Sequence, residues 1–382
     1  MQKTGLATLI GSLSILPLDA KSDTTFYGFI SGGIESNKAS GGQAPGYASR
    51  TRVVDHVSRL GFKGREDLGN GNSALWQLES GLRHFEQGGV DDRGQNAAFA
   101  TRNSFIGLEH AAIGRILLGH HDSAYKMFTG SGNPTLGTAL MPNATANQFG
   151  PSAVNSRGEA RLNNSLHYYS PNWNGFKLGA TWAMDETRQG GGNAKRLSLG
   201  LGYVWRGLTL AAAWDRRYDT AIAPAGNTPP SAVAGKSLSY HSLAASYRFD
   251  TGTLIGGNYE WGRLDPPGGE RLRQDDWLIA LSQPFGAAEL KLSYGQLGAL
   301  KQLGAGADGK DFRASQWLLG GGYRLSKTTQ AFAYYTRIRN HAKASANFSV
   351  NPLYDQALGT PKASLSAGSD PQAMGLGLSI AF

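Results

Sequence analysis

The sequence ends with MGLGLSIAF at residues 374–382. Met374, Leu376, Leu378, Ile380 and Phe382 occupy every second position, and only glycine, serine and alanine lie between them. Strict alternation of apolar and small residues predicts a β-strand that has one apolar face. Because chain ends are usually frayed and polar, a strand that ends on an aromatic residue must be held by a paired strand.

The same alternation recurs along the chain. Apolar residues take every second position in three further segments, 176–184, 197–205 and 288–294. A strand of about 9–11 residues crosses a bilayer when it is tilted by about 45°, whereas the strands of soluble sandwiches are usually shorter. The repeated pattern therefore favours strands that span a membrane.

Short and long connections alternate between these strands. Seven short connections have the composition of tight turns, at 67–71, 110–113, 171–174, 206–207, 250–252, 283–286 and 325–327. Eight long polar connections lie between them, at 35–56, 84–99, 123–159, 186–195, 219–236, 264–271, 298–311 and 341–370. Short turns at one rim and long loops at the other are typical of transmembrane barrels, and these connections join sixteen strands.

We therefore expect an all-β protein: a transmembrane 16-stranded antiparallel β-barrel that forms a single domain at residues 21–382. Tryptophan and tyrosine recur near the predicted strand ends, as in the aromatic girdles of membrane proteins. A barrel has no free edge, so we expect the last strand to pair with residues 24–34 and Phe382 to face lipid. A large soluble β-sandwich or propeller is the alternative fold, although no repeat of about 40–50 residues supports a propeller.

Composition and charge narrow the functional classes. Cysteine is absent, which excludes a disulfide framework and a thiolate metal site. The 37 basic and 28 acidic residues give a formal charge of +9, which favours an anionic partner. After residue 20, no stretch approaches the roughly 20 apolar residues of a membrane helix.

The first twenty residues have the pattern of a secretory signal peptide. Lys3 is basic, an apolar run follows it, and Pro17 breaks that run shortly before Ala20. We expect residues 1–20 to be removed from the mature chain. A short buried segment is the alternative.

Several stretches resemble the Gram-negative trimeric porins, especially the neisserial and β-proteobacterial type. They are TTFYGFISGGIE (24–35), SRLGFKGREDLGNG (58–71), ALWQLESGL (74–82), TRNSFIGLE (101–109), GRILLGHHDSAYK (114–126) and the terminal strand. The resemblance implies an outer-membrane homotrimer of sixteen-stranded barrels, each with its own pore, in contact with outer-membrane lipid and lipopolysaccharide. It also implies that the third long loop, 123–159, folds into the barrel and that the outer-membrane assembly machinery reads the C-terminal Phe382.

The resemblance also assigns a contact between subunits. The first strands and the terminal strand form the subunit contact of the family, and the second long loop, 84–99, reaches a neighbour there. The carboxylates of this loop are Glu86, Asp91 and Asp92. We expect them to pair with arginines across the interface.

Alternation assigns the side chains that point into the barrel. Leu60 and Phe62 form the apolar set of one strand, so the basic residues beside them point inward. An arginine that faces lipid at the bilayer midplane costs about 2–4 kcal/mol, which supports this assignment. The inward charged residues predicted in this way are Arg59, Lys63, Arg65, Glu79, Arg83, Arg102 and Arg161.

The resemblance gives some of these residues a place in the pore. It puts Arg59, Arg102 and Arg161 on the basic wall opposite the constriction loop, and Glu79 on a wall carboxylate. Phe29 stands where enteric members of the family have a basic wall residue, which lowers the charge expected at that point. The alternative is that these arginines are ordinary polar lumen residues paired with carboxylates.

The third long loop has an uneven charge pattern. No acidic residue occurs from 123 to 158, and Lys126 and Arg157 are its only basic residues. Constriction loops of the resembled family often carry carboxylates, so the negative side of the constriction is left here to Asp122 and Glu159 at the loop ends. Charges at the narrowest point of a channel act at close quarters, so the basic wall predicts a preference for anions. A disordered surface loop is the alternative.

Other motifs do not indicate catalysis. GAGADGKD (304–311) has Asp311 where a Walker A loop needs Ser or Thr to hold Mg²⁺. His120 and His121 have no metal-ligand set beside them in the sequence, and no G-x-S-x-G motif occurs. We expect no catalytic residue, no cofactor, no metal and no nucleic-acid partner.

These observations favour a passive diffusion channel for small hydrophilic solutes and ions across the outer membrane. We expect it to pass small anionic or neutral solutes in preference to cations. A substrate-specific porin that binds small carboxylates on the arginines is one alternative. An outer-membrane enzyme is the other, and hydrolysis of phospholipid by the purified protein would reveal it.

Overall fold

The structure of the protein is a computed structural model that describes residues 22–42, 47–82, 100–141, 143–186, 192–222, 231–304, 306–353 and 365–382. The predicted signal peptide at 1–20, Arg83, and the carboxylates predicted for loop 84–99 lie outside the described residues. Within these ranges, no helix has the length and apolarity that crossing a membrane requires.

One antiparallel sheet contains the strands of the described residues. In chain order they are β1 (Ser22–Gly41), β2 (Arg50–Asp55), β3 (Arg59–Gly69), β4 (Asn72–Gly81), β5 (Ser104–His110), β6 (Gly114–Asp122), β7 (Arg161–Tyr169), β8 (Phe176–Ala183), β9 (Arg196–Trp205), β10 (Leu208–Ala221), β11 (Ser231–Arg248), β12 (Leu254–Leu264), β13 (Leu272–Phe285), β14 (Ala288–Leu297), β15 (Ala314–Arg324), β16 (Thr329–Asn340) and β17 (Ser369–Ala381). A short 3₁₀ helix, η2 (Gly309–Phe312), precedes β15.

The described strand segments number seventeen but form sixteen positions around the barrel. β2 and β3 share one position, because both pair with β1, with Gly32 opposite Asp55 and Phe29 opposite Arg59. Between them Val57 has a φ of 64°, so a backbone kink divides one long strand into two segments. The predicted sixteen-stranded barrel is therefore confirmed.

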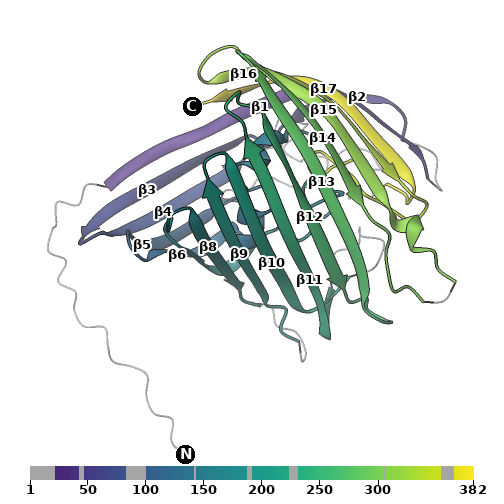
Figure 1. The fold of residues 1–382 in the computed structure, drawn as a ribbon, viewed down its shortest axis with the longest axis horizontal. Helices are drawn as coiled ribbons and strands as arrows, with labels where there is room; N and C mark the ends of the chain where they lie inside the picture. Colours follow the sequence, from purple (N-terminus) through teal and green to yellow (C-terminus); the bar gives the residue numbers. More distant parts are fainter. Residues whose placement is uncertain are drawn as a thin grey trace, which may run out of the picture.

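The sheet closes on itself through its first and last strands (Figure 1). β1 pairs with β17 over thirteen consecutive residue pairs, as far as Gly41 opposite Ser369. At the other end of this seam, the Gly28 N–H donates to the Phe382 carbonyl at 3.2 Å, and the Phe382 N–H donates to the Gly28 carbonyl at 3.1 Å. The Phe382 ring stacks on Phe26 with 5.2 Å between ring centres. The predicted pairing of the chain end is confirmed.

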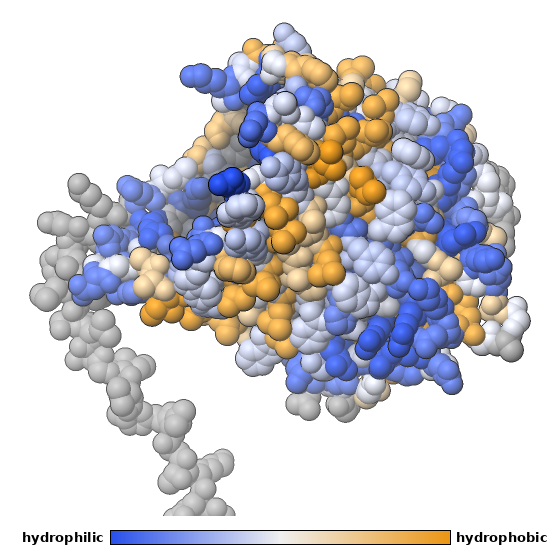
Figure 2. Space-filling view, viewed as in Figure 1, coloured by the Kyte–Doolittle hydropathy of each residue, from blue (hydrophilic) through white to orange (hydrophobic). Residues whose placement is uncertain are grey.

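Apolar side chains face outward around the barrel and form the belt that a bilayer covers. Figure 2 shows part of this belt as a band of hydrophobic residues, with hydrophilic residues at its edges. Large side chains in the belt are strongly exposed, for example Ile106 at 64% and Ile279 at 57%. Such patches are rare on soluble monomers, but they are required on the lipid-facing side of a transmembrane barrel.

Most of the predicted connections are confirmed. Tight turns follow β3, β5, β7, β9, β11, β13 and β15, so the short connections share one rim. The prediction of a long connection at 35–56 is wrong, because β1 continues to Gly41 and β2 begins at Arg50. Polar residues in this stretch line the lumen, where Glu35 accepts hydrogen bonds from Arg52 at 2.8 Å and from Asn37 at 3.0 Å. β10 and β11 likewise extend into the predicted connection 219–236.

The third long loop lies inside the barrel, as predicted. It contains two short helices, α1 (Ala124–Phe128) and α2 (Leu136–Ala139). α1 packs against β8, β9 and β10, and α2 packs against β11, β12 and β13. Inward-facing glycines make room for the loop: a Cβ added at Gly200 would lie 2.4 Å from the Phe128 ring. The small residues of the alternating pattern thus form the surface on which the loop rests.

Deletion of Phe382 should impair assembly more than the loss of one apolar contact explains. The residue supplies the last backbone pair of the closing seam and a ring stack with Phe26, whereas burial of a Phe side chain alone contributes about 1.5–3 kcal/mol. The amount of folded protein in the membrane fraction, resolved on gels of unheated samples, measures the effect. Ile380→Ala is the matched control, because it trims an outward side chain of β17 and keeps the seam. Equal amounts of the two variants would contradict the role of Phe382.

Candidate functional site

A first ion-pair cluster on the inner wall joins Arg59, Glu79 and Arg102. A Glu79 carboxylate oxygen lies 2.5 Å from Arg102 Nε and 3.8 Å from Arg59 Nη1. The Tyr27 hydroxyl donates to the other oxygen of Glu79 at 3.1 Å. The Arg59 guanidinium also lies over the ring of Phe29, 4.6 Å from its centre. Phe29 therefore supports a wall arginine at the point where the family pattern has a basic residue.

A second cluster joins Asp122, Lys126 and Arg161. The Asp122 carboxylate lies 3.1 Å from Lys126 Nζ and 3.1 Å from Arg161 Nε. The side chain of Asn103 accepts from Arg161 Nε at 2.7 Å and donates to Asp122 at 3.1 Å. Lys126 lies in α1, so this cluster connects the constriction loop to the wall strands β6 and β7.

The charges of the two clusters do not cancel. Together they hold four cations and two carboxylates, a surplus of two positive charges. The cationic side chains keep between 15% and 25% of their surface exposed, whereas the two carboxylates keep 8% and 10%. The cations therefore meet the water of the lumen, and the carboxylates lie behind them.

Two other predicted basic residues lie outside these clusters. Lys63 is exposed, and its Nζ lies 5.2 Å from the centre of the Tyr27 ring. Arg157 is buried and donates from Nη1 to the Gln274 side-chain oxygen at 2.7 Å. Arg157 thus fastens the loop to β13 and does not face the wall arginines.

Glu159 also binds within the protein. Its carboxylate accepts from the Ser131 N–H at 2.7 Å and from the Ser131 hydroxyl at 3.0 Å. Burial raises the pKa of the Glu159 carboxyl, because a low-dielectric environment disfavours the charged form. The residue closes the two ends of the loop on each other and adds little negative charge to the constriction.

A wall carboxylate that the sequence did not single out holds the loop in place. Glu260 on β12 is fully buried and accepts from the N–H groups of Arg157 at 2.9 Å and Gly158 at 3.1 Å. The hydroxyl of Tyr125 in α1 donates to the same carboxylate. The acid-free loop thus takes its hydrogen-bond acceptor from the wall. The exposed Tyr259 beside it indicated by alternation that Glu260 points inward, but no local pattern indicated its partner.

Further contacts tie the loop to the far wall and to the last long connection. The Gln148 amide donates to the Gln316 carbonyl on β15 at 2.8 Å. In the connection after β16, the Asn347 N–H donates to the Ser152 carbonyl at 3.0 Å, and Phe348 is completely buried. The described part of this connection, 341–353, therefore packs directly on the constriction loop.

The histidines of the inner wall pack on one another. His121 and His167 have ring centres 5.0 Å apart, and Tyr169 donates its hydroxyl to the Asp122 carbonyl at 3.0 Å beside them. Among the residues that the structure describes, no three His, Asp or Glu side chains are placed to hold a metal ion.

A closed barrel with an apolar outer belt, an inward loop and a charged inner wall is a channel-forming transmembrane β-barrel. This chain belongs to the Gram-negative porin family, whose family model matches residues 16–343. It is accordingly a protein of the Gram-negative outer membrane. The resemblance drawn from the sequence is confirmed.

The chain is similar to known outer-membrane proteins over most of its length. An outer membrane porin protein of Bordetella pertussis is 27% identical, over 90% of this chain and 95% of that protein. An anion-selective porin from Comamonas acidovorans has the same fold, with a TM-score of 0.69 and 22% identity over 95% of this chain and 100% of that chain. OmpT of Vibrio cholerae in its trimer form has a TM-score of 0.62 and 14% identity, over 94% and 99% of the two chains.

Glu260→Gln should loosen the constriction loop and destabilise the barrel. The amide has one acceptor oxygen where the carboxylate has two, so a buried N–H of the loop loses its partner at a cost of about 1–3 kcal/mol. We expect a lower thermal unfolding midpoint and a noisier single-channel current. Glu109→Gln is the control, because the Arg65–Glu109 pair at 2.8 Å is largely exposed. A Glu260→Gln protein with the stability and current of the wild type would show that the loop does not depend on this carboxylate.

Proposed function

We propose that this porin is a passive diffusion channel that prefers small anions to cations. The observation that carries the proposal is the surplus of two positive charges on the exposed side of the two wall clusters. The loop that faces them has no acidic residue from 123 to 158. Solute passes down its own gradient, and no nucleophile or cofactor takes part.

Two surplus charges act strongly on an ion in the constriction. In bulk water, one unit charge at a distance of 4 Å contributes about 1 kcal/mol, and low-dielectric walls focus the field further. The Debye length is about 10 Å at 0.1 M salt and about 3 Å at 1 M. The preference for anions should therefore shrink as the salt concentration rises.

The similarity to known porins also favours a preference for anions. The porin from Comamonas acidovorans that shares the fold is described as anion-selective. A porin specific for small carboxylates, the alternative within channels, needs guanidinium groups that are free to bind the substrate in a bidentate manner. Arg102 and Arg161 already bind Glu79 and Asp122, so we favour passage over substrate binding.

Replacement of Arg102 and Arg161 by alanine should abolish most of the anion preference. The surplus of two charges falls to zero, because Arg59 and Lys126 then balance the two carboxylates. We expect the chloride-over-potassium permeability ratio, measured from the reversal potential in a salt gradient, to fall severalfold. The fold should persist, because lumen positions of barrels tolerate substitution.

Glu79→Gln should change the ratio in the opposite direction, since it removes a negative charge from the same cluster. Arg324→Ala, at the exposed end of β15, is the control and should leave the ratio close to that of the wild type. A wild-type reversal potential of cation-selective sign would end the proposal. A saturable block of the current by small carboxylates would favour the substrate-specific alternative instead.

We infer further that the porin assembles as a homotrimer. The solved OmpT structure of the same fold is described in a trimer form. The outward side chains of β1 and β17 are apolar and strongly exposed, with Ile34 at 56% and Leu376 at 64%, and the two residues are opposite each other in the seam. Such a face can pack against a second copy or against lipid.

Electrophoresis in mild detergent should show a band near three times the monomer mass. Substitution of alanine for Glu86, Asp91 and Asp92 should weaken this band, because the ion pairs predicted across the interface are lost. Asp250→Ala with Glu270→Ala, two exposed acids elsewhere on the surface, serves as the control. A purely monomeric protein in native-like lipid would rule out the trimer.

A further inference from the structure

A cavity lies inside the barrel between the constriction loop and the inner wall of β5 to β10. Its volume is about 500 Å³, within the range of about 300–1,000 Å³ that is usual for small-molecule sites. Met127, Phe128 and Pro134 of the loop line one side of it, and residues of the tight turns after β5 and β7 line its edge. The cavity is therefore at the tight-turn end of the lumen, whereas Asp122 and Arg161 are at the opposite ends of β6 and β7.

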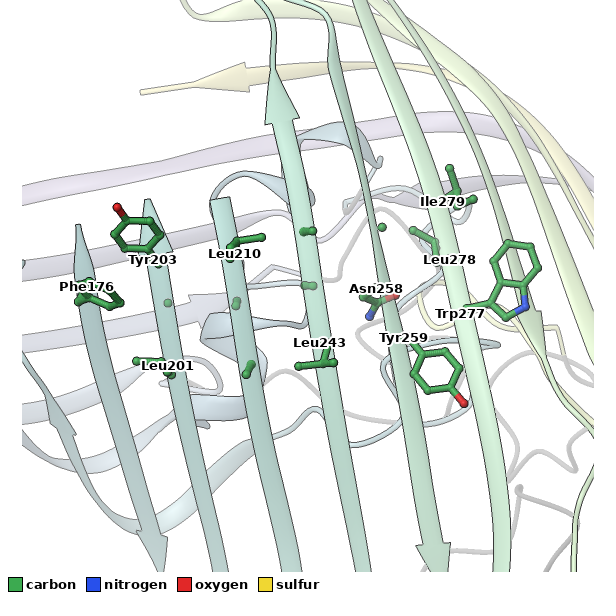
Figure 3. Close-up of a pocket in the computed structure, with 16 residues that line it drawn as sticks. Phe176, Leu201, Tyr203, Leu210, Leu243, Asn258, Tyr259, Trp277, Leu278 and Ile279 are labelled. Carbon is green, nitrogen blue, oxygen red and sulfur yellow. The ribbon is translucent and has the colours of Figure 1, made fainter. Parts of the chain in front are cut away.

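Small residues on the inner wall leave room for this cavity. On their outer face, β8 to β10 carry large side chains, which Figure 3 labels as Phe176, Leu201, Tyr203 and Leu210. The inner positions between them include Gly202 and Ala211, which are directly opposite each other on β9 and β10. Phe128 of the loop rests beside them on Gly179 and Gly200, where an added Cβ would overlap its ring.

Two cationic side chains line the cavity, Arg115 on β6 and Lys177 on β8. The Arg115 guanidinium lies 5.2 Å from the centre of the Tyr169 ring, and Lys177 is exposed. Within the described residues, neither cation forms an ion pair. Glu109 is opposite Arg115 in the sheet, but its carboxylate binds Arg65 at 2.8 Å. Three cations thus share one carboxylate, which leaves a surplus of two positive charges at this cavity.

Apolar surface lies beside these charges. Met127 and Phe128 are half-buried, and Pro134 is exposed, so all three keep surface that a ligand can cover. A phenylalanine ring packs favourably on a second ring, and a methionine sulfur makes favourable contacts with ring edges. A guanidinium binds a carboxylate in a bidentate manner. Arg115 and Lys177 are two strands apart, about 10 Å, so one carboxylate can lie between these two long side chains.

We propose that this cavity binds an aromatic carboxylate. The ring of the ligand lies against Phe128 and Met127, and its carboxylate lies between Arg115 and Lys177. A short aliphatic acid would leave the apolar surface in water, and an uncharged aromatic molecule would leave the two cations without a partner. The bound acid narrows the exit of the channel and so reduces the ion current. The proposal does not depend on the anion preference, because a ligand from the side of the tight turns reaches the cavity without passing the wall clusters.

Titration of the ion current with benzoate, at constant ionic strength in a planar bilayer, tests this site. Benzoate should lower the conductance of the wild-type channel in a saturable manner, and more strongly from the side of the tight turns. Arg115→Gln with Lys177→Met should raise the half-blocking concentration about tenfold or more, because charge-assisted hydrogen bonds are lost. Phe128→Leu keeps an apolar side chain on the glycines of the wall. It should weaken the block by benzoate more than the block by cyclohexanecarboxylate, which has no aromatic ring.

Matched controls separate this site from general effects of charge. Arg324→Ala with Lys327→Ala removes two exposed cations at the same rim and should leave the block by benzoate unchanged. Arg102→Ala with Arg161→Ala should also retain the block from the side of the tight turns, because the wall clusters do not take part. The mobility of unheated samples on gels shows that each variant is folded.

The choice of ligand gives the test its sharpest outcomes. Benzyl alcohol lacks the charge and succinate lacks the ring, so neither should block at concentrations where benzoate does. Equal block of the wild type and the Arg115→Gln, Lys177→Met variant by benzoate would overturn the proposal. Equal block by succinate would also overturn it, and its loss in the Arg102→Ala, Arg161→Ala variant would assign the binding to the wall clusters instead.

Discussion

The closed seam between β1 and β17 is the constraint on which the rest of the structure depends. The hydrocarbon core of a bilayer holds no water for backbone N–H and C=O groups, and each unsatisfied group costs several kcal/mol. Once the sheet has no edge, each strand can send one side chain to lipid and the next to the lumen. The apolar belt and the half-exposed Phe382 at the chain end both follow from this requirement.

The inner wall is divided between a part that meets water and a part that the constriction loop covers. Under the loop, the wall carries glycine and buried apolar residues such as Leu278 and Leu318. The loop has no acidic residue from 123 to 158, so carboxylates of the far wall bind it: Glu260 accepts from its backbone, and Asp276 accepts from the Asn155 amide at 2.7 Å. Because Glu260 and Asp276 are hydrogen-bonded to the loop, they do not neutralise the surplus of positive charge on the open side of the lumen.

The sequence predicted the features of the fold that the membrane imposes on every strand. Alternation predicted the barrel, its closure and the shared rim of the tight turns, because lipid covers the outer face and every outward position in the membrane must be apolar or small. It failed at 35–56, because the far end of β1 has polar residues on both faces: Glu35 and Asn37 are buried on the inner face, and Lys38 and Ser40 are exposed on the outer face. Alternation identified the charged wall residues but not their partners. The Arg102–Glu79 pair depends on strand register. The hydrogen bonds of Glu260 with the loop join residues about a hundred positions apart in the sequence.

Surface connections of proteins usually vary freely in sequence, because little packs against them. The connection after β16 does not have this freedom: Asn347 and Phe348 rest on the constriction loop, and Arg52 donates to the Asn351 carbonyl at 2.7 Å. These residues are buried or half-buried, so a change at 347–351 is transmitted to the constriction loop on which they pack. The evolution of this connection is therefore coupled to the evolution of the channel, because a substitution at 347–351 also changes the support of the constriction loop.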